Sequence, residues 1–188
     1  MSENYSGKKL YIVISQTGTA FSRILRFITG EEYNHASISL EDDLSLMYSF
    51  GRVNPYNPFF GGFVTESPNF GTFKRFSNTK VIVLSIDISD KTYYDMADRL
   101  KDMYERKDEY SYNYLGVYLA AFKIHRKKKN CYYCSEFVRD FLQNYSINGS
   151  LTLNGIVHPM DFLKIPDSKD MYYGKLKDFG LEKVNKSI

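Results

Sequence analysis

A helix with a cysteine in its first turn is the feature that most constrains the fold of this chain. Residues 130–138 read NCYYCSEFV, and apolar side chains then recur at the spacing of one helix face: Phe137, Val138, Phe141, Leu142 and Tyr145. Cys134 precedes Phe137 and Val138 by three and four residues, so it lies over the same inward face. The positive end of the helix dipole favours a thiolate there. The sequence therefore predicts a reactive thiol at the start of a helix that packs on the core.

The remaining hydrophobic pattern predicts an α+β fold in a single domain, residues 1–188. Apolar or alternating runs predict strands at residues 10–14, 35–40, 44–50 and 80–86, with an acidic hairpin turn at 41–43. Helical spacing predicts helices at residues 18–30, 89–104 and 115–124, the second capped by Ser89 or Asp90. A short element is expected at 159–163 and a last strand at 171–176. The Gly- and Pro-rich residues 51–78 predict a long excursion with at most short strands.

Composition excludes several classes of protein. The net charge of +3 (25 basic minus 22 acidic residues) is too small to indicate a nucleic-acid partner, and the basic run at 126–129 predicts a solvated turn. No apolar run reaches the length of a membrane span, and the polar residues 1–9 do not resemble a signal peptide. Two cysteines without a secretory signal favour a reducing compartment, so a cytoplasmic location is expected.

Three histidines are candidates for a partner of the thiol. His125 borders the lysine run and is expected to be exposed. His158 precedes Pro159, which favours a surface or capping role. His35 opens an alternating strand, where an inward imidazole needs a partner. Taken alone, His35 fits a cap on the solvent face of the hairpin as well as it fits a catalytic base.

Residues 33–38 (YNHASI) and 133–138 (YCSEFV) together resemble the circularly permuted branch of the NlpC-type cysteine peptidases and amidases, to which the YiiX-like proteins belong. Residues 22–26, 47–51, 112–113 and 159–162 are also similar to that family, in the expected order. The resemblance implies a papain-like fold, in which an antiparallel sheet packs against helices. It also implies a nucleophile helix near the C-terminus instead of near the N-terminus.

The resemblance implies that Cys134 is the nucleophile and that His35 is the base. Relatives often orient the imidazole with a carboxylate, an amide or a second histidine on the following strand. This chain departs from that pattern, because Ser49 aligns there best; Tyr48 on that strand and Glu66 in the long excursion stay open as alternatives. The implied reaction is attack on an acyl or amide carbonyl to give a thioester, with no metal or cofactor. The backbone N–H of Cys134 is one expected oxyanion donor.

The expected substrate is a small molecule, a peptide or a lipid-derived amide. Candidate substrate-binding residues are Tyr48, Tyr112, Asn113 and Glu66. For Tyr112 and Asn113, packing and turn roles fit the sequence at least as well.

Other interpretations remain open at this point. Cys131 and Cys134 form a C-x-x-C pair, but no βαβ pattern precedes it, and a zinc site lacks two further ligands. Cys131 is most simply a bystander. The more serious rival is a papain-like domain that binds a ligand without catalysis. A third alternative is acyl transfer to a lipid or an amine.

Overall fold

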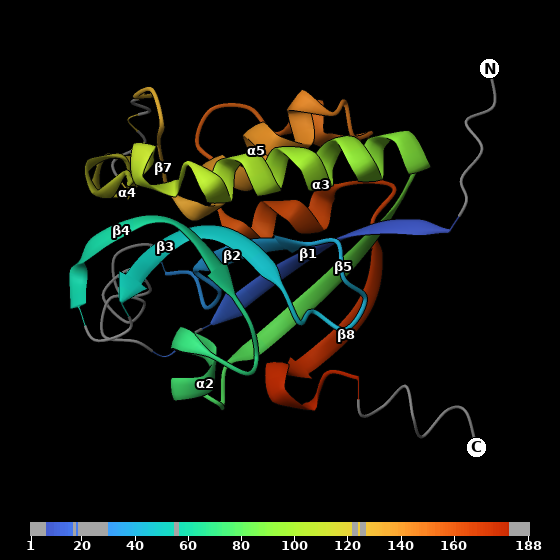
Figure 1. Ribbon diagram of the computed structural model, residues 1–188, viewed down its shortest axis with the longest axis horizontal. Helices are drawn as coiled ribbons and strands as arrows, with labels where there is room; N and C mark the ends of the chain where they lie inside the picture. Colours follow the sequence, from blue (N-terminus) through green and yellow to red (C-terminus); the bar gives the residue numbers. More distant parts are fainter. Residues whose placement is uncertain are drawn as a thin grey trace.

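A computed structural model of the chain describes residues 7–16, 18, 30–54, 57–121, 124 and 127–180. Its main element is a six-stranded antiparallel sheet in the order β4-β3-β2-β1-β5-β8 (Figure 1). The strands are β1 (Lys8–Gln16), β2 (His35–Ser39), β3 (Met47–Asn54), β4 (Asn57–Glu66), β5 (Lys80–Ile88) and β8 (Lys169–Lys175). A second, two-stranded parallel sheet joins β6 (Ser111–Tyr112) to β7 (Cys131–Tyr132). The α+β class and the antiparallel sheet predicted from the sequence are confirmed.

Helices cover both faces of the large sheet. The helices are α2 (Gly71–Arg75), α3 (Asp90–Glu105), α4 (Tyr114–Ala121) and α5 (Cys134–Asn144). The short 3-10 helices are η1 (Lys107–Glu109), η2 (Ser150–Thr152), η3 (Pro159–Lys164) and η4 (Leu176–Asp178). Figure 1 shows α3 and α5 on one side of the sheet and the short α2 on the other. Among the described residues, no helix is long and apolar enough to cross a membrane.

The central strand β1 is buried on both of its faces. Leu10, Ile12 and Ile14 point into the large core under α3 and α5. Tyr11 and Val13 point into a smaller core on the opposite side. A strand covered on both sides needs apolar residues at every position, which explains why this run shows no alternation.

Local sequence signals placed the starts of α3 and α5 correctly. The Ser89 hydroxyl accepts a hydrogen bond from the Thr92 N–H, so the predicted cap of α3 is confirmed. Helix α5 begins at Cys134, as its hydrophobic period predicts. The helix predicted at residues 18–30 falls outside the described residues, apart from Gly18 and Gly30.

The prediction that residues 51–78 contain at most short strands is wrong. Strand β3 continues to Asn54, and β4 then pairs with it along most of its ten residues. Gly61 and Gly62 weaken the strand pattern in the sequence of β4, because glycine is a poor strand former. Both lie close to other backbone segments: a Cβ on Gly61 would lie 2.7 Å from the Tyr112 Cβ, and one on Gly62 would lie 3.1 Å from the Tyr110 carbonyl oxygen.

An aromatic cluster around Phe50 joins the β3–β4 hairpin to α5. The Phe50 ring lies 5.3 Å from Phe137 and 5.6 Å from Phe63, centroid to centroid.

We expect Phe50→Ala to lower the free energy of unfolding by about 3–5 kcal/mol, because it leaves a cavity in a close-packed core. Phe60→Ala on the same hairpin is the control; its side chain is 68% exposed, so we expect a change within about 0.5 kcal/mol. Denaturant unfolding measures both, and equal losses would contradict this account of the core.

Candidate active site

Cys134 is the first residue of α5 and is buried at the edge of the core. The residue before it, Tyr133, has an extended backbone and serves as the N-cap. Phe137, Val138 and the rest of the inward face anchor α5 against β2 and β3. The helix is therefore fixed by its own core contacts, and the thiol projects from the end with the positive dipole.

His35 opens β2 beside this thiol. Its backbone pairs with Ser15 of the central strand, so the imidazole projects from the best-buried part of the sheet. The thiol of Cys134 and the imidazole interact closely enough to shift each other's pKa, and the Cys134 Sγ lies 3.9 Å from the carbonyl oxygen of Asn34. The structure thus brings together the two residues that the sequence pairs across most of the chain.

A carboxylate holds the other side of the imidazole. The His35 Nε2 lies 2.9 Å from Oε1 and 3.1 Å from Oε2 of Glu66. The hydroxyl of Ser37 donates to Glu66 Oε2 at 2.5 Å. The Phe73 ring of α2 lies 6.3 Å from the imidazole ring and covers it from the second core. The arrangement is a cysteine–histidine–carboxylate relay.

Electrostatics favour a thiolate and an imidazolium in this relay. Burial lowers the pKa of the His35 imidazole, but the charge of Glu66 and hydrogen bonds to Cys134 and Glu66 raise it more, to about 10. Burial raises the pKa of the Cys134 thiol, but the hydrogen bond and the positive charge of His35 outweigh it. Backbone hydrogen bonds from Ala36 and Ser135 act in the same direction, so the thiol pKa lies below its ordinary value.

The structure does not place Ser49 on the imidazole, so this part of the sequence interpretation needs correction. The Ser49 hydroxyl is fully buried and donates to the backbone carbonyl of Ala36 at 2.6 Å. It links β3 to β2 instead of orienting His35. Glu66 takes the orienting position because the long β3–β4 hairpin returns it to the His35 side. No local pattern reveals this geometry, because residues 51–66 carry glycines and prolines, which are poor strand formers.

The other residues predicted to bind substrate are Tyr112, Asn113 and Tyr48, and the structure places them differently. Tyr112 lines the pocket beside the thiol. Burial and the charge of Cys134 raise the pKa of this phenol well above its usual value, so it stays a proton donor. Asn113 instead accepts from the Gly116 N–H at 2.8 Å and so caps the start of α4. Tyr48 stacks on Phe63, with ring centroids 6.0 Å apart.

The two residues that follow the thiol have structural roles. The Ser135 hydroxyl donates to the carbonyl of Val157 at 2.6 Å and ties α5 to the segment before η3. Glu136 is fully buried beside Asn113 and Arg139, with a carboxylate oxygen 3.5 Å from Asn113 Nδ2 and the other 3.9 Å from an Arg139 nitrogen. Burial raises the pKa of Glu136.

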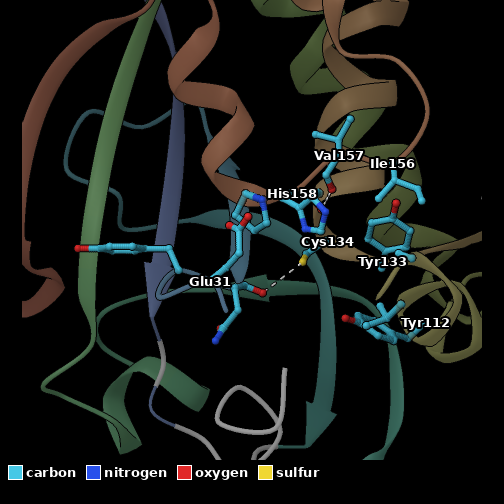
Figure 2. Close-up of a pocket in the computed structure, with 13 residues that line it drawn as sticks. Glu31, Tyr112, Tyr133, Cys134, Ile156, Val157 and His158 are labelled. Atoms are coloured by element: carbon cyan, nitrogen blue, oxygen red, sulfur yellow. Dashed lines mark hydrogen bonds between the residues drawn. The ribbon is translucent and has the colours of Figure 1, made fainter. Parts of the chain in front are cut away.

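A small, mainly apolar pocket of about 50 Å³ opens beside Cys134. Figure 2 shows Glu31 and His158 on one side of the thiol and Tyr112 and Tyr133 on the other. Sequence reasoning missed Glu31, for which no local pattern gave a signal. It assigned His158 to capping, and the His158 N–H does bond Asp161 at the start of η3, but its side chain also lines the pocket. The one local sequence signal at His158 was Pro159, which follows it.

The pair of Cys131 and Cys134 also left a redox pair and a zinc site as alternatives. Cys131 lies buried in β7, and both thiols are free. No group of three or more histidine, cysteine or acidic side chains in the described part of the chain is arranged to hold a metal ion. His125 lies outside the described residues.

Comparisons with known proteins add no relative: no family model, no curated protein and no solved structure matches this chain. A proposal of function therefore depends on the geometry of the site and on the motifs quoted above.

We expect Cys134 to react rapidly with iodoacetamide well below about pH 8.5, the pKa of a free cysteine thiol. In His35→Ala the thiol keeps its burial but loses its cationic partner, so its reactivity at neutral pH should fall roughly tenfold for each unit that its pKa rises. The rate of alkylation against pH, followed by mass spectrometry in a Cys131→Ser background, measures this. Identical profiles in the two proteins would show that no thiolate–imidazolium pair exists.

Glu66→Gln separates the two candidates for the orienting residue. The amide keeps the shape of the side chain but removes its charge, so the pKa of His35 should fall below about 10 and that of Cys134 should rise. Ser49→Ala is the matched control; it should cost about 1 kcal/mol of stability and leave the alkylation profile unchanged. If Ser49→Ala shifts the profile as far as Glu66→Gln does, our assignment of Glu66 is wrong.

Proposed function

We propose that this protein is a cysteine-dependent hydrolase that cleaves an acyl or amide bond through a thioester on Cys134. The observation that carries the proposal is the relay of Cys134, His35 and Glu66, in which the pKa of a thiol at a helix start lies below its usual value. We further propose a single papain-like domain of the permuted NlpC type. An early histidine strand and a late nucleophile helix packed on an antiparallel sheet support this assignment.

In the first step, the Cys134 thiolate attacks the carbonyl carbon of the substrate. The backbone N–H of Cys134 lies in the first turn, where the helix offers it no acceptor, and the Tyr112 hydroxyl faces the same sulfur. Both groups are placed to donate to the oxyanion; removing one such donor typically costs about 2.7–4 kcal/mol in the transition state. The His35 imidazolium then protonates the leaving amine or alcohol as the tetrahedral intermediate collapses to the thioester.

In the second step, the now neutral imidazole takes a proton from water, which attacks the thioester. The carbon–sulfur bond breaks, the carboxylic acid leaves, and the thiolate–imidazolium pair is restored. Glu66 acts through His35: it stabilises the imidazolium and fixes the orientation of the ring. No step requires a metal or a cofactor.

The geometry favours a hydrolase over a domain that only binds ligands. The case for a binding domain rested on the lack of a carboxylate near the imidazole, and Glu66 supplies one. The pocket walls suit an acyl group with apolar character, from a small molecule, a peptide or a lipid-derived amide. Acyl transfer to a lipid or an amine shares the first step and differs in the acceptor that resolves the thioester.

We expect p-nitrophenyl esters of short and long acyl chains to give a burst of p-nitrophenol, stoichiometric with enzyme, followed by slower turnover. Mass spectrometry should find the acyl group on Cys134. Cys134→Ser should abolish the burst, and Ser49→Ala should keep it. An absent burst with every acyl chain, together with an unacylated thiol, would refute the hydrolase. Turnover that needs an added amine or lipid alcohol would instead identify an acyltransferase.

Amide substrates should report the protonation of His35 directly. A leaving aniline needs a proton from the imidazolium, so hydrolysis of acyl p-nitroanilides should fall as the pH rises through about 10, the pKa of His35. In Glu66→Gln this alkaline limb should move to lower pH. A limb that stays in place would show that another group donates the proton.

A further inference from the structure

Helix α4 presents apolar side chains to solvent. Its sequence, YLGVYLAA, contains no charged residue. Leu115 is 51% exposed and Tyr118 is 59% exposed, and these two residues lie three apart on one face. Ile124, shortly after the helix, is 52% exposed. Single exposed apolar residues are ordinary, but an uncharged helix with an exposed apolar face is not.

The tip of the β3–β4 hairpin extends this face. Val53 is 64% exposed and Phe60 is 68% exposed. The close approach of Gly61 to Tyr112 and Tyr114 places the hairpin against the start of α4. Figure 1 shows the end of β3, the start of β4 and the helix α4 at the same end of the molecule.

A basic turn borders the same region. Lys128 and Lys129 are exposed, and the turn is closed by a hydrogen bond from the Cys131 N–H to the Lys128 carbonyl. Asn130 adopts a left-handed backbone, with φ at 54°, and its carbonyl accepts from the Ser111 N–H, so the turn is tied to the strand that leads into α4.

We propose that this end of the protein docks on an anionic lipid membrane. The docking face, named here the α4 surface, consists of Val53, Phe60, Leu115, Tyr118, Ile124, Lys128 and Lys129. Apolar and aromatic side chains bordered by lysines match the chemistry of a membrane interface, where the former enter the acyl boundary and the latter meet anionic headgroups. A contact between the α4 surfaces of two copies would bring their lysines together, and a nucleic acid would leave the apolar side chains in water.

The α4 surface also adjoins the Cys134 pocket. Val117 and Ala120, on the same helix as Leu115 and Tyr118, line that pocket. Docking would therefore hold the pocket close to the lipid surface. The extension of this proposal, that the pocket takes its acyl group from the membrane, rests on the proposed function. The docking itself does not, because none of its residues takes part in the reaction.

Co-sedimentation of the full chain with vesicles tests the proposal. We expect binding to phosphatidylcholine vesicles that contain about a third phosphatidylserine and much weaker binding to phosphatidylcholine alone. Added salt should weaken the binding because it screens the lysines. Cys134→Ser should bind as the wild type does, which separates this result from any failure of the hydrolase proposal.

Matched variants locate the binding face. Lys128→Gln with Lys129→Gln should weaken binding to anionic vesicles about 25-fold, since each basic residue near such a surface contributes roughly fivefold. Leu115→Asn with Tyr118→Asn should weaken it at least about tenfold. The controls are Lys175→Gln with Lys177→Gln, and Tyr173→Asn, whose side chain is 57% exposed on β8, at the other edge of the sheet. The controls should bind as the wild type does.

Three results would overturn the proposal. The first is equal or absent binding to the two kinds of wild-type vesicle, which needs no variant and so is independent of any folding defect. The second is an equal loss of binding in the control variants, with circular dichroism confirming that all variants are folded. The third is a wild-type dimer in sedimentation equilibrium that Leu115→Asn with Tyr118→Asn dissociates, in the absence of vesicle binding; a second copy would then cover the α4 surface.

Discussion

The buried contact between His35 and Glu66 is the interaction on which the site depends. Burial by itself favours a neutral imidazole and a protonated thiol, which would leave Cys134 unreactive. The carboxylate reverses this balance, because it makes the charged imidazole the stable form, and the imidazolium then makes the thiolate stable. An isolated charge in such a place would be costly, whereas a relay of three charges offset by hydrogen bonds is tolerated. The reactivity of the thiol is thus set by a residue that is not expected to touch the substrate.

The β3–β4 hairpin is the structural condition for this relay. Glu66 is the last residue of β4 and stands opposite Met47, and its side chain reaches back past Gly51 to the imidazole. A Cβ on Gly51 would lie 3.7 Å from both Glu66 Oε1 and His35 Cε1, so this position of β3 lies in van der Waals contact with the pair. The aromatic cluster around Phe50 in turn fixes the hairpin against α5. The helix that carries the thiol and the strand that carries the carboxylate therefore share one core.

Local patterns in the sequence predicted what depends on local structure. The start of α5 at Cys134 and the Ser89 cap of α3 follow from side chains within one or two turns. The place of Glu66 depends on the register between two strands and on glycines that hide one of them, so no local pattern reveals it. Glu31 and His158 meet the thiol only after distant segments fold together. His35 could be predicted because the chain has three histidines and residues 33–38 resemble a known motif.

Helix α4 connects the pocket with the surface. One part of this short helix lines the cavity beside Cys134, and another part is exposed among apolar and basic residues. Packed side chains on one helix turn move together, so any occupant of the α4 surface that shifts the helix also changes the pocket wall. By linkage, a pocket ligand that moves Val117 must alter the affinity of the surface for its occupant by the same factor. The proposed active site and the α4 surface therefore share one helix.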